Sequence, residues 1–292
     1  LAIANPNGFE GQMIVAAGHL AFDPALSAPV GAPGVWFDVS VTNSYTHETQ
    51  NNNTPDALDV IGKWYDRRLN GFTASIEAYN TAGNRDRPYV MTNALNGKPV
   101  ISCGGYYISP LSGSWRRVVF SSVNTYFVSM VFGSQDTGGH LLGLRNNWDF
   151  QRGVNTNNGI VTSANVPIWK TVGYPVWTNG IAINGQTTGL NGGYQVLSIA
   201  ITNSTGHGVD TLGMVNNWQN SGGQRYGEIL LYTNVLSDVE RRANEGYLAV
   251  KWGLGSFSAP AVTISNGATL DVRGAYAFAA LRGSGSVVKT GT

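Results

Sequence analysis

The sequence predicts an all-β protein on three observations: high glycine content, low charge and many turn dipeptides. Glycine makes up 38 of 292 residues, aromatic residues 11% and charged residues only 12%, about half the ~25% of an ordinary soluble domain. Asn-Gly pairs suit hairpin turns because both residues tolerate positive φ. They begin at Asn7, Asn70, Asn96, Asn158, Asn179, Asn184, Asn191 and Asn266. Short strand-like runs such as 117–120 and 196–201 lie between them, which indicates a sandwich or a barrel.

A buried strand followed by one helix is predicted late in the chain. Residues 229–232 are an apolar, β-favouring run. Ser237, followed three residues later by Glu240, is a capping box that begins a helix, and Gly253 ends it. The stripe expected to pack recurs at spacings of three and four and consists of Val239, Ala243, Tyr247 and Val250. The helix residues expected to stay in water are Arg241, Arg242 and Glu245.

This strand and helix resemble the end of the laminin-G-like, concanavalin A-like jelly-roll domains of large bacterial surface proteins. Earlier in the chain, further segments resemble motifs of the same family and occur in the family's order, at residues 35–38, 64–66, 87–88, 95–100, 126–131, 141–143, 183–185 and 193–198. The resemblance implies a jelly-roll β-sandwich over residues 31–256 with one short C-terminal helix. It also implies that Trp36, Trp64 and Trp252 belong to the core.

The two ends of the chain differ from its middle. Residues 262–272 and 281–288 resemble the autotransporter-associated β-strand repeat of parallel β-helix stalks, and residues 7–22 resemble another copy. The resemblance implies β-helix-like strand segments at 1–30 and 257–292; the alternative is two extra strands of the sandwich. A single rung cannot bury both of its faces, so such segments need neighbours. We therefore expect a part of a larger multidomain protein, extracellular or on the cell surface.

Net charge and apolar run length argue against two classes of partner, and the cysteine count limits how the fold is stabilised. The net charge is +1 without a basic stripe, which argues against nucleic acid. No apolar run approaches the ~20 residues of a membrane helix, so no membrane insertion is expected. The lone Cys103 permits no internal disulfide, and the fold must depend on packing.

The sequence contains no recognisable active site. A glycoside hydrolase needs two carboxylates about 5 to 10 Å apart, yet no Glu in a predicted strand has an acidic residue two positions away. Glu228 is the one Glu in a clear strand, and the family resemblance implies a scaffold role for it. The four histidines lack zinc-binding spacing. A jelly-roll hydrolase or polysaccharide lyase that pairs Glu228 with Asp149 or Asp210 in space remains an alternative.

A structural calcium ion is the one cofactor that the sequence suggests. The hard oxygen ligands available are Asp38, Asp66, Asp136, Asp149 and Asp210, but their spacing does not form a calcium loop. Asp38 and Asp66 can equally pair with Arg67, Arg68 or the backbone. No ligand set is therefore assigned.

A duplicated phrase, Leu-Gly-x-x-Asn-Asn-Trp, carries the functional prediction. An indole covers the apolar face of a sugar ring while adjacent amides bond its hydroxyls. The candidate carbohydrate-binding residues are Asn146, Asn147, Trp148, Asn216, Asn217, Trp218 and Trp177. The alternative is that these tryptophans pack at the sandwich edge while the asparagines form turns. We expect a non-catalytic, extracellular carbohydrate-binding module for a plant cell-wall or host glycan; a structural or adhesive spacer is the alternative.

Overall fold

The computed structural model describes residues 2–3, 12–15, 19–22, 28–47, 59–68, 73–78, 88–103, 116–134, 139–145, 150–152, 173–190, 193–213, 224–254, 261–272 and 280–289. The chain divides into two compact units. The sandwich unit is Pro33–Trp177 with Ala182–Val235, and the terminal unit is Leu1–Ala32 and Leu236–Thr292 with Thr178–Ile181. The domain boundaries expected from the sequence stay a prediction.

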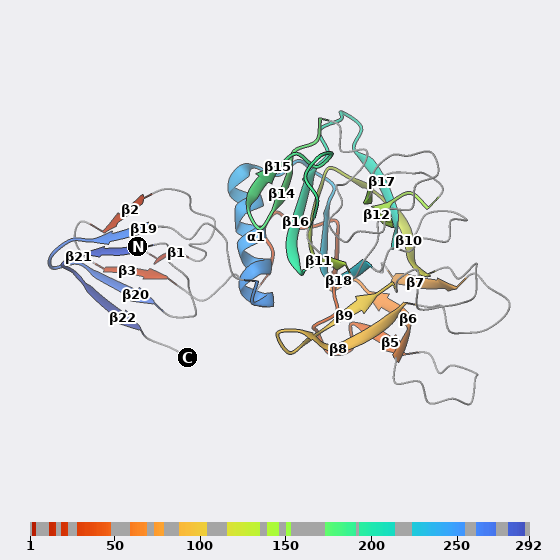
Figure 1. The fold of residues 1–292 in the computed structure, drawn as a ribbon, viewed down its shortest axis with the longest axis horizontal. Coiled ribbons are helices and arrows are strands. Elements are labelled where there is room, and N and C mark those ends of the chain that lie inside the picture. Colours follow the sequence, from red (N-terminus) through yellow and green to blue (C-terminus); the bar gives the residue numbers. More distant parts are fainter. Residues whose placement is uncertain are drawn as a thin grey trace. The chain divides into compact units, whose positions relative to one another are not determined.

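Two sheets that share strand β6 form the middle of the chain (Figure 1). Their strands are β4 (Val35–Asp38), β5 (Tyr45–His47), β6 (Asp59–Tyr65), β7 (Thr73–Ala78), β8 (Tyr89–Leu95), β9 (Lys98–Ser102), β10 (Arg116–Thr125), β11 (Phe127–Ser134), β12 (Gly139–Gly143), β13 (Phe150–Arg152), β14 (Val176–Thr178), β15 (Ile181–Ile183), β16 (Gln195–Ala200), β17 (His207–Leu212) and β18 (Gln224–Tyr232). One sheet has the order β13-β12-β17-β10-β7-β6, with β5 also on β6. The other continues from β6 through β8-β9-β18-β11-β16-β14-β15, with β4 also on β18.

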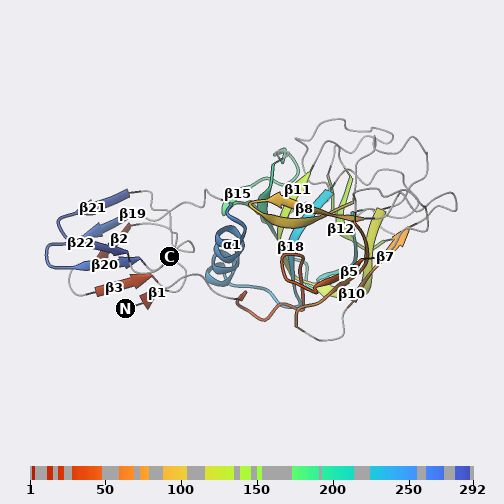
Figure 2. The ribbon, with the colours of Figure 1, turned by 90° about the horizontal axis from the view of Figure 1, so that it is seen from below.

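Figure 2 shows the strands of both sheets from below. Aromatic side chains from the two sheets meet in a common core. Phe37 on β4 packs edge-on against Phe120 on β10, with ring centroids 5.4 Å apart, and stacks on Trp64 at 5.0 Å. The Tyr226 hydroxyl on β18 donates to the Leu141 carbonyl on β12 at 2.6 Å. Contacts that join the sheets face to face define a sandwich. The prediction of an all-β sandwich with a helix near its C-terminal end is therefore confirmed.

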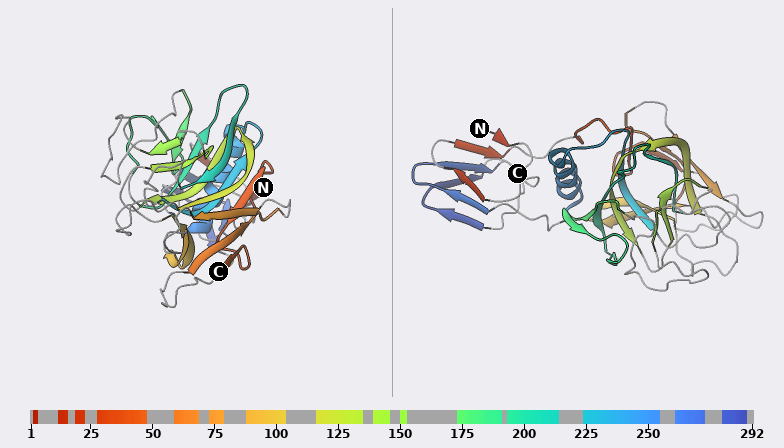
Figure 3. Two further views of the ribbon diagram at one scale, coloured as in Figure 1. Left: turned by 90° about the vertical axis from the view of Figure 1, so that its right-hand side faces the viewer. Right: turned by 90° about the horizontal axis from the view of Figure 1, so that it is seen from above.

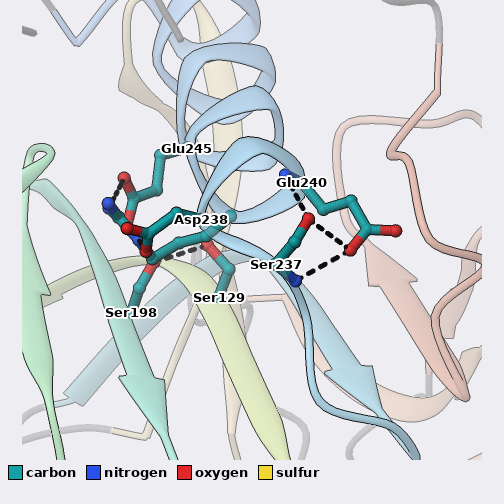
Figure 4. A network of polar contacts seen from close by, with 7 residues as sticks. Ser129, Ser198, Ser237, Asp238, Glu240 and Glu245 are labelled. Atoms are coloured by element: carbon teal, nitrogen blue, oxygen red, sulfur yellow. Dashed lines mark hydrogen bonds and ion pairs between the residues drawn. The ribbon is translucent and has the colours of Figure 1, made fainter. Parts of the chain in front are cut away.

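Central strands of the sandwich are buried on both faces. Residues 195–199 of β16 are all buried, although a half-exposed strand would alternate. Ser129 on β11 and Ser198 on β16 are direct partners in the ladder, and their buried hydroxyls lie 2.9 Å apart (Figure 4). Each hydroxyl satisfies the other, which removes the cost of burying a polar group.

The predicted Asn-Gly turns occur at two of the described pairs. Asn96 and Gly97 have φ of 48° and 78°, and Asn179 and Gly180 have 49° and 80°. Positive φ at both residues is the type I′ pattern that matches the twist of a hairpin. Asn184 instead accepts a hydrogen bond from the Gln186 N–H at 3.0 Å. The pairs at Asn7, Asn70, Asn158 and Asn191 lie outside the described residues.

The terminal unit contains short parallel strands that lie side by side (Figure 3). They are β1 (Ala2–Ile3), β2 (Gln12–Val15), β3 (His19–Phe22), β19 (Ala261–Ile264), β20 (Thr269–Val272), β21 (Ala280–Gly283) and β22 (Ser286–Lys289). One sheet has the order β1-β3-β20-β22 and the other β2-β19-β21, all parallel. Strands from the two ends of the chain thus share both sheets.

Successive strands of the terminal unit alternate between these two sheets. The chain leaves one sheet at the end of β3 and returns to the other at β19, which pairs with β2 in register. The alternation continues across this gap as it would across a turn. Residues 23–260 therefore separate two sets of strands that share both sheets, and the β-helix assignment of the ends stays a prediction.

The helix α1 (Asp238–Trp252) begins and ends as predicted. Ser237 Oγ accepts from the Glu240 N–H at 3.3 Å, and Glu240 Oε2 accepts from the Ser237 N–H at 2.8 Å (Figure 4). Gly253 ends the helix in the left-handed conformation with φ of 63°, and its N–H bonds to the Val250 carbonyl.

The predicted packing stripe of this helix is wrong in part. Val239 is 77% exposed, whereas Arg241 and Glu245 are buried. Arg241 NH1 lies 2.7 Å from Glu245 Oε2, and the Asn244 side chain bonds both the N–H and the carbonyl of Val30. Because these polar groups are satisfied by each other, they can be buried where the apolar pattern alone favours water. The buried Tyr247 agrees with the prediction.

The capping box makes a small part of the stability depend on pH. Hydrogen bonds from the backbone N–H and the hydroxyl of Ser237 hold the pKa of Glu240 below its usual value. A carboxyl with a lowered pKa in the folded state stabilises above its unfolded pKa, and this contribution is lost as pH falls through the folded pKa. We expect Ser237→Ala to cost about 1 kcal/mol at neutral pH.

Urea unfolding of the wild type and Glu240→Gln between pH 7 and pH 3 checks this expectation. The stability difference between them should shrink below about pH 4, since Gln cannot titrate. An unchanged difference across this range would contradict the assignment of the bond to the carboxylate.

Candidate functional site

The structure places one predicted sugar-binding residue. Trp177 lies on β14 after the buried Val176, and its side chain is partly exposed. Six predicted residues, Asn146, Asn147, Trp148, Asn216, Asn217 and Trp218, lie outside the described residues. Their role in sugar binding stays a prediction. The structure describes the strands that precede them in the sequence, β12 and β17.

The duplicated phrase begins on two neighbouring strands. Leu142 on β12 is the direct partner of Leu212 on β17, and both are fully buried. Each is followed by a glycine with positive φ, 141° at Gly143 and 85° at Gly213. A backbone of this kind disfavours other residues, so the shared Leu-Gly marks the same local event, the end of a strand. The first two residues of the repeated phrase therefore mark a strand end in both copies.

The chain leaves these two strands in opposite directions because β12 and β17 are antiparallel. Leu144 passes close to Gly208, where an added Cβ would lie 3.0 Å from its Cδ2. Arg145 then lies beside Asp210: its N–H donates to Oδ1 at 2.7 Å, and its Nε is 3.6 Å from Oδ2. The first motif thus follows residues that run toward the start of β17, whereas the second follows the end of β17. The described residues before the two motifs therefore run in opposite directions along β17.

Two tyrosines that the sequence analysis did not select contact the turn between β16 and β17. Tyr174 OH accepts a hydrogen bond from Asn203 Nδ2 at 3.1 Å, and Tyr126 OH donates to the Ser204 carbonyl at 3.5 Å. Both bonds are exposed. Tyr126 precedes β11 and Tyr174 precedes β14, but no spacing links residues 126, 174 and 203 in the sequence. Only the folded sheet brings them to one turn.

Phe150 supports this turn from the first motif's side. It follows Trp148 by two residues in the sequence and is 2% exposed. Its ring centroid lies 6.1 Å from that of Tyr174 and 5.3 Å from that of His207. Phe150, the first strand residue after the motif, is therefore packed between Tyr174 and the first residue of β17.

Glu228 is part of a buried acidic pair. It is the ladder partner of Asp38 on β4, and both side chains are fully buried. Glu228 Oε1 accepts from Trp36 Nε1 at 2.7 Å, while Asp38 Oδ2 lies 3.2 Å from Arg67 NH1. Directly opposed residues of a ladder project to the same face, so these carboxylates converge. Since both are buried and hydrogen-bonded, the geometry fits a scaffold rather than acid and base groups that reach a substrate.

Asp66 and Arg68 continue this buried cluster. Asp66 Oδ1 accepts from the N–H groups of Trp36 at 3.2 Å and Arg68 at 2.9 Å, and Oδ2 lies 3.1 Å from Arg68 NH2. Arg68 also donates to the carbonyls of Pro33 and Gly34. The alternative that Asp38 and Asp66 pair with Arg67, Arg68 or the backbone is confirmed: Asp38 pairs with Arg67, and Asp66 pairs with Arg68 and two backbone N–H groups.

The core role implied for three tryptophans holds for two of them. Trp64 and Trp252 are fully buried. Trp36 is only partly buried, and the Arg67 guanidinium lies 4.2 Å from its ring centroid. An arginine over an indole face is a favourable cation–π arrangement. Trp36 therefore links the buried carboxylates to a cation at the surface.

Two absences concern the described part of the chain. There, no group of three or more His, Cys, Asp or Glu side chains is placed to hold a metal ion. Among these same residues, α1 is too short and too polar to cross a membrane. Asp136 and Asp149, two of the acids considered for calcium, lie outside the described ranges.

No protein-family model and no curated protein matches this chain.

Proposed function

We propose that the chain is a non-catalytic carbohydrate-binding module of a larger extracellular or cell-surface protein. The observation that supports this best is the repeated Leu-Gly-x-x-Asn-Asn-Trp phrase, whose first residues are ladder partners in adjacent strands. In the sequence, the ends of β12 and β17 are each followed by two amides and an indole. This residue set supplies a flat apolar platform and directional hydrogen bonds, which is what a pyranose ring requires.

The proposed ligand is a polysaccharide of a plant cell wall or a host glycan. A shallow site of this kind binds in the millimolar to micromolar range, roughly −4 to −8 kcal/mol. Because the two motifs follow antiparallel strands, β12 and β17, one polymer chain would meet them as separate contacts. Several modules in one protein would raise retention through avidity.

Affinity electrophoresis of the purified chain in gels with plant, algal and host polysaccharides tests this proposal. We expect at least one glycan to retard the wild type, and Trp148→Ala or Trp218→Ala to weaken retardation about tenfold, near 1.4 kcal/mol. Trp148→Phe and Trp218→Phe serve as conservative variants that keep an aromatic face. Retardation that survives both alanine variants together would keep the function and reject these residues.

A structural or adhesive spacer is the second candidate, and one observation favours it. Strands from both ends of the chain share the same two parallel sheets, so the middle of the chain is carried as an insertion. Such a placement would hold a domain along a stalk. An absence of retardation by every polysaccharide would favour this candidate.

A further inference from the structure

The turn between β16 and β17 presents polar side chains next to two tyrosine hydroxyls. Thr202, Asn203, Ser204 and Thr205 are all exposed. Asn203 donates one N–H to Tyr174, and its amide has a second N–H and a carbonyl oxygen that can bond hydroxyls of a ligand. The rings of Tyr126 and Tyr174 are partly exposed. Hydroxyl-bonding groups and aromatic faces thus occur together on described residues.

The backbone holds both tyrosines in place. A Cβ added to Gly206 would lie 2.9 Å from Tyr126 Cε2 and 2.6 Å from Asn124 Oδ1, so the ring sits against a turn that only glycine allows. Gly206 also has a φ of 67°. On the other tyrosine, Phe150 packs at 6.1 Å and the Pro175 carbonyl accepts from the Ala200 N–H at 3.0 Å. Aromatic groups fixed before binding lose little conformational entropy when a ligand arrives.

The described residues of this surface carry no charge. Residues 124–126, 173–175 and 201–206 contain no Asp, Glu, Lys or Arg. The described charged pair next along β17, Arg145 with Asp210, is internally compensated at 3.6 Å. Acidic glycans are bound through cationic side chains, since arginine and lysine are the groups that complement carboxylate and sulfate. A neutral sugar chain needs only stacking and hydroxyl-directed hydrogen bonds.

We infer that Tyr126, Tyr174 and Asn203 form a binding surface for a neutral oligosaccharide chain. The inference rests on the proposed function and deepens it, because it adds residues that no repeated motif indicates and restricts the ligand class. Phe150, which packs on Tyr174, follows the first Asn-Asn-Trp motif by two residues in the sequence.

Affinity electrophoresis and calorimetry with neutral and acidic polysaccharides test the inference on the full chain. The neutral probes are xyloglucan, mixed-linkage β-glucan and galactomannan, and the acidic probes are polygalacturonate and alginate. We expect binding to a neutral probe, with Tyr174→Ala about tenfold weaker and Asn203→Ala about threefold to tenfold weaker. Tyr174→Phe keeps the ring on Phe150 and loses only the hydroxyl, so it should weaken binding less than Tyr174→Ala.

Tyr65→Ala is the matched control, because Tyr65 is a partly exposed tyrosine on β6. It should bind within about twofold of the wild type, as expected for a residue outside the contact. The inference is overturned if Tyr174→Ala and Asn203→Ala bind like the wild type while Trp148→Ala does not, or if acidic probes bind best; the proposed function then survives. Absence of binding to every probe overturns the function and the inference together.

Discussion

Asp66→Ala is expected to lower the free energy of unfolding of the sandwich by about 3 kcal/mol or more. The fully buried carboxylate accepts from two backbone N–H groups, those of Trp36 and Arg68, and pairs with the Arg68 guanidinium at 3.1 Å. Alanine would leave both N–H groups without their acceptor and the guanidinium, 22% exposed, without its anion. The partial exposure of Arg68 places the estimate at the low end of the about 3 to 5 kcal/mol for a broken buried pair.

Urea unfolding followed by tryptophan fluorescence measures this cost. Asp66→Asn keeps one acceptor oxygen for the backbone and should lose about half as much. Asp210→Ala is the matched control: its partner Arg145 is 40% exposed, so the expected loss is below about 1 kcal/mol. Equal losses for Asp66→Ala and Asp210→Ala would reject the buried cluster as a stability determinant.

Local signals in the sequence predicted local structure well. Ser237 and Glu240 form the expected cap, Asn96 and Asn179 begin the expected hairpin turns, and Gly253 ends the helix. Each of these depends on a few consecutive residues whose backbone preferences are intrinsic. Fold class followed because many such turns, separated by short apolar runs, leave few alternatives to a sandwich.

Features that depend on pairing between distant residues could not be predicted in the same way. The ladder that opposes Glu228 to Asp38 joins strands far apart in the sequence, and no spacing rule gives its register. Arg241 and Glu245 were expected in water because the apolar pattern ignores ion pairs, yet they are buried 2.7 Å apart. The shared Leu-Gly predicts a strand end in each copy of the duplicated phrase. It does not predict that the two strands, β12 and β17, pair with each other in an antiparallel ladder.

The candidate binding surface shows the same limit. Tyr174 and Asn203 meet across 29 residues, and their hydrogen bond depends on the placement of β14 beside β16. Tyrosines are common in loops, so the sequence around Tyr174 does not predict its hydrogen bond with Asn203. Tryptophan with two amides is a rarer pattern, which is why the sequence selected Trp148 and Trp218 first.

Gly283→Ala and Gly285→Ala are expected to remove the last two strands of the terminal unit while the sandwich stays folded. A Cβ on Gly283 would lie 2.0 Å from the Ile264 carbonyl oxygen, and one on Gly285 would lie 2.2 Å from Ile264 Cγ2 and 2.5 Å from the Ser265 carbonyl oxygen. These are backbone and buried groups, so the neighbouring turn must move. The Gly285 N–H also donates to the Ile264 carbonyl at 3.0 Å, a bond that such a movement would break.

The expected cost of either substitution is about 2 to 4 kcal/mol, since overpacking and a lost backbone hydrogen bond add together. Gly267→Ala is the control that separates crowding from backbone strain: its φ is 78°, and nothing lies within 4 Å of an added Cβ. It should cost only about 1 kcal/mol, the strain of a left-handed alanine. Amide hydrogen exchange should show lost protection at 280–289 in the first two variants and unchanged protection in β11 and β18. If Gly267→Ala has the same effect as Gly283→Ala, left-handed backbone rather than close packing of successive turns controls these strands.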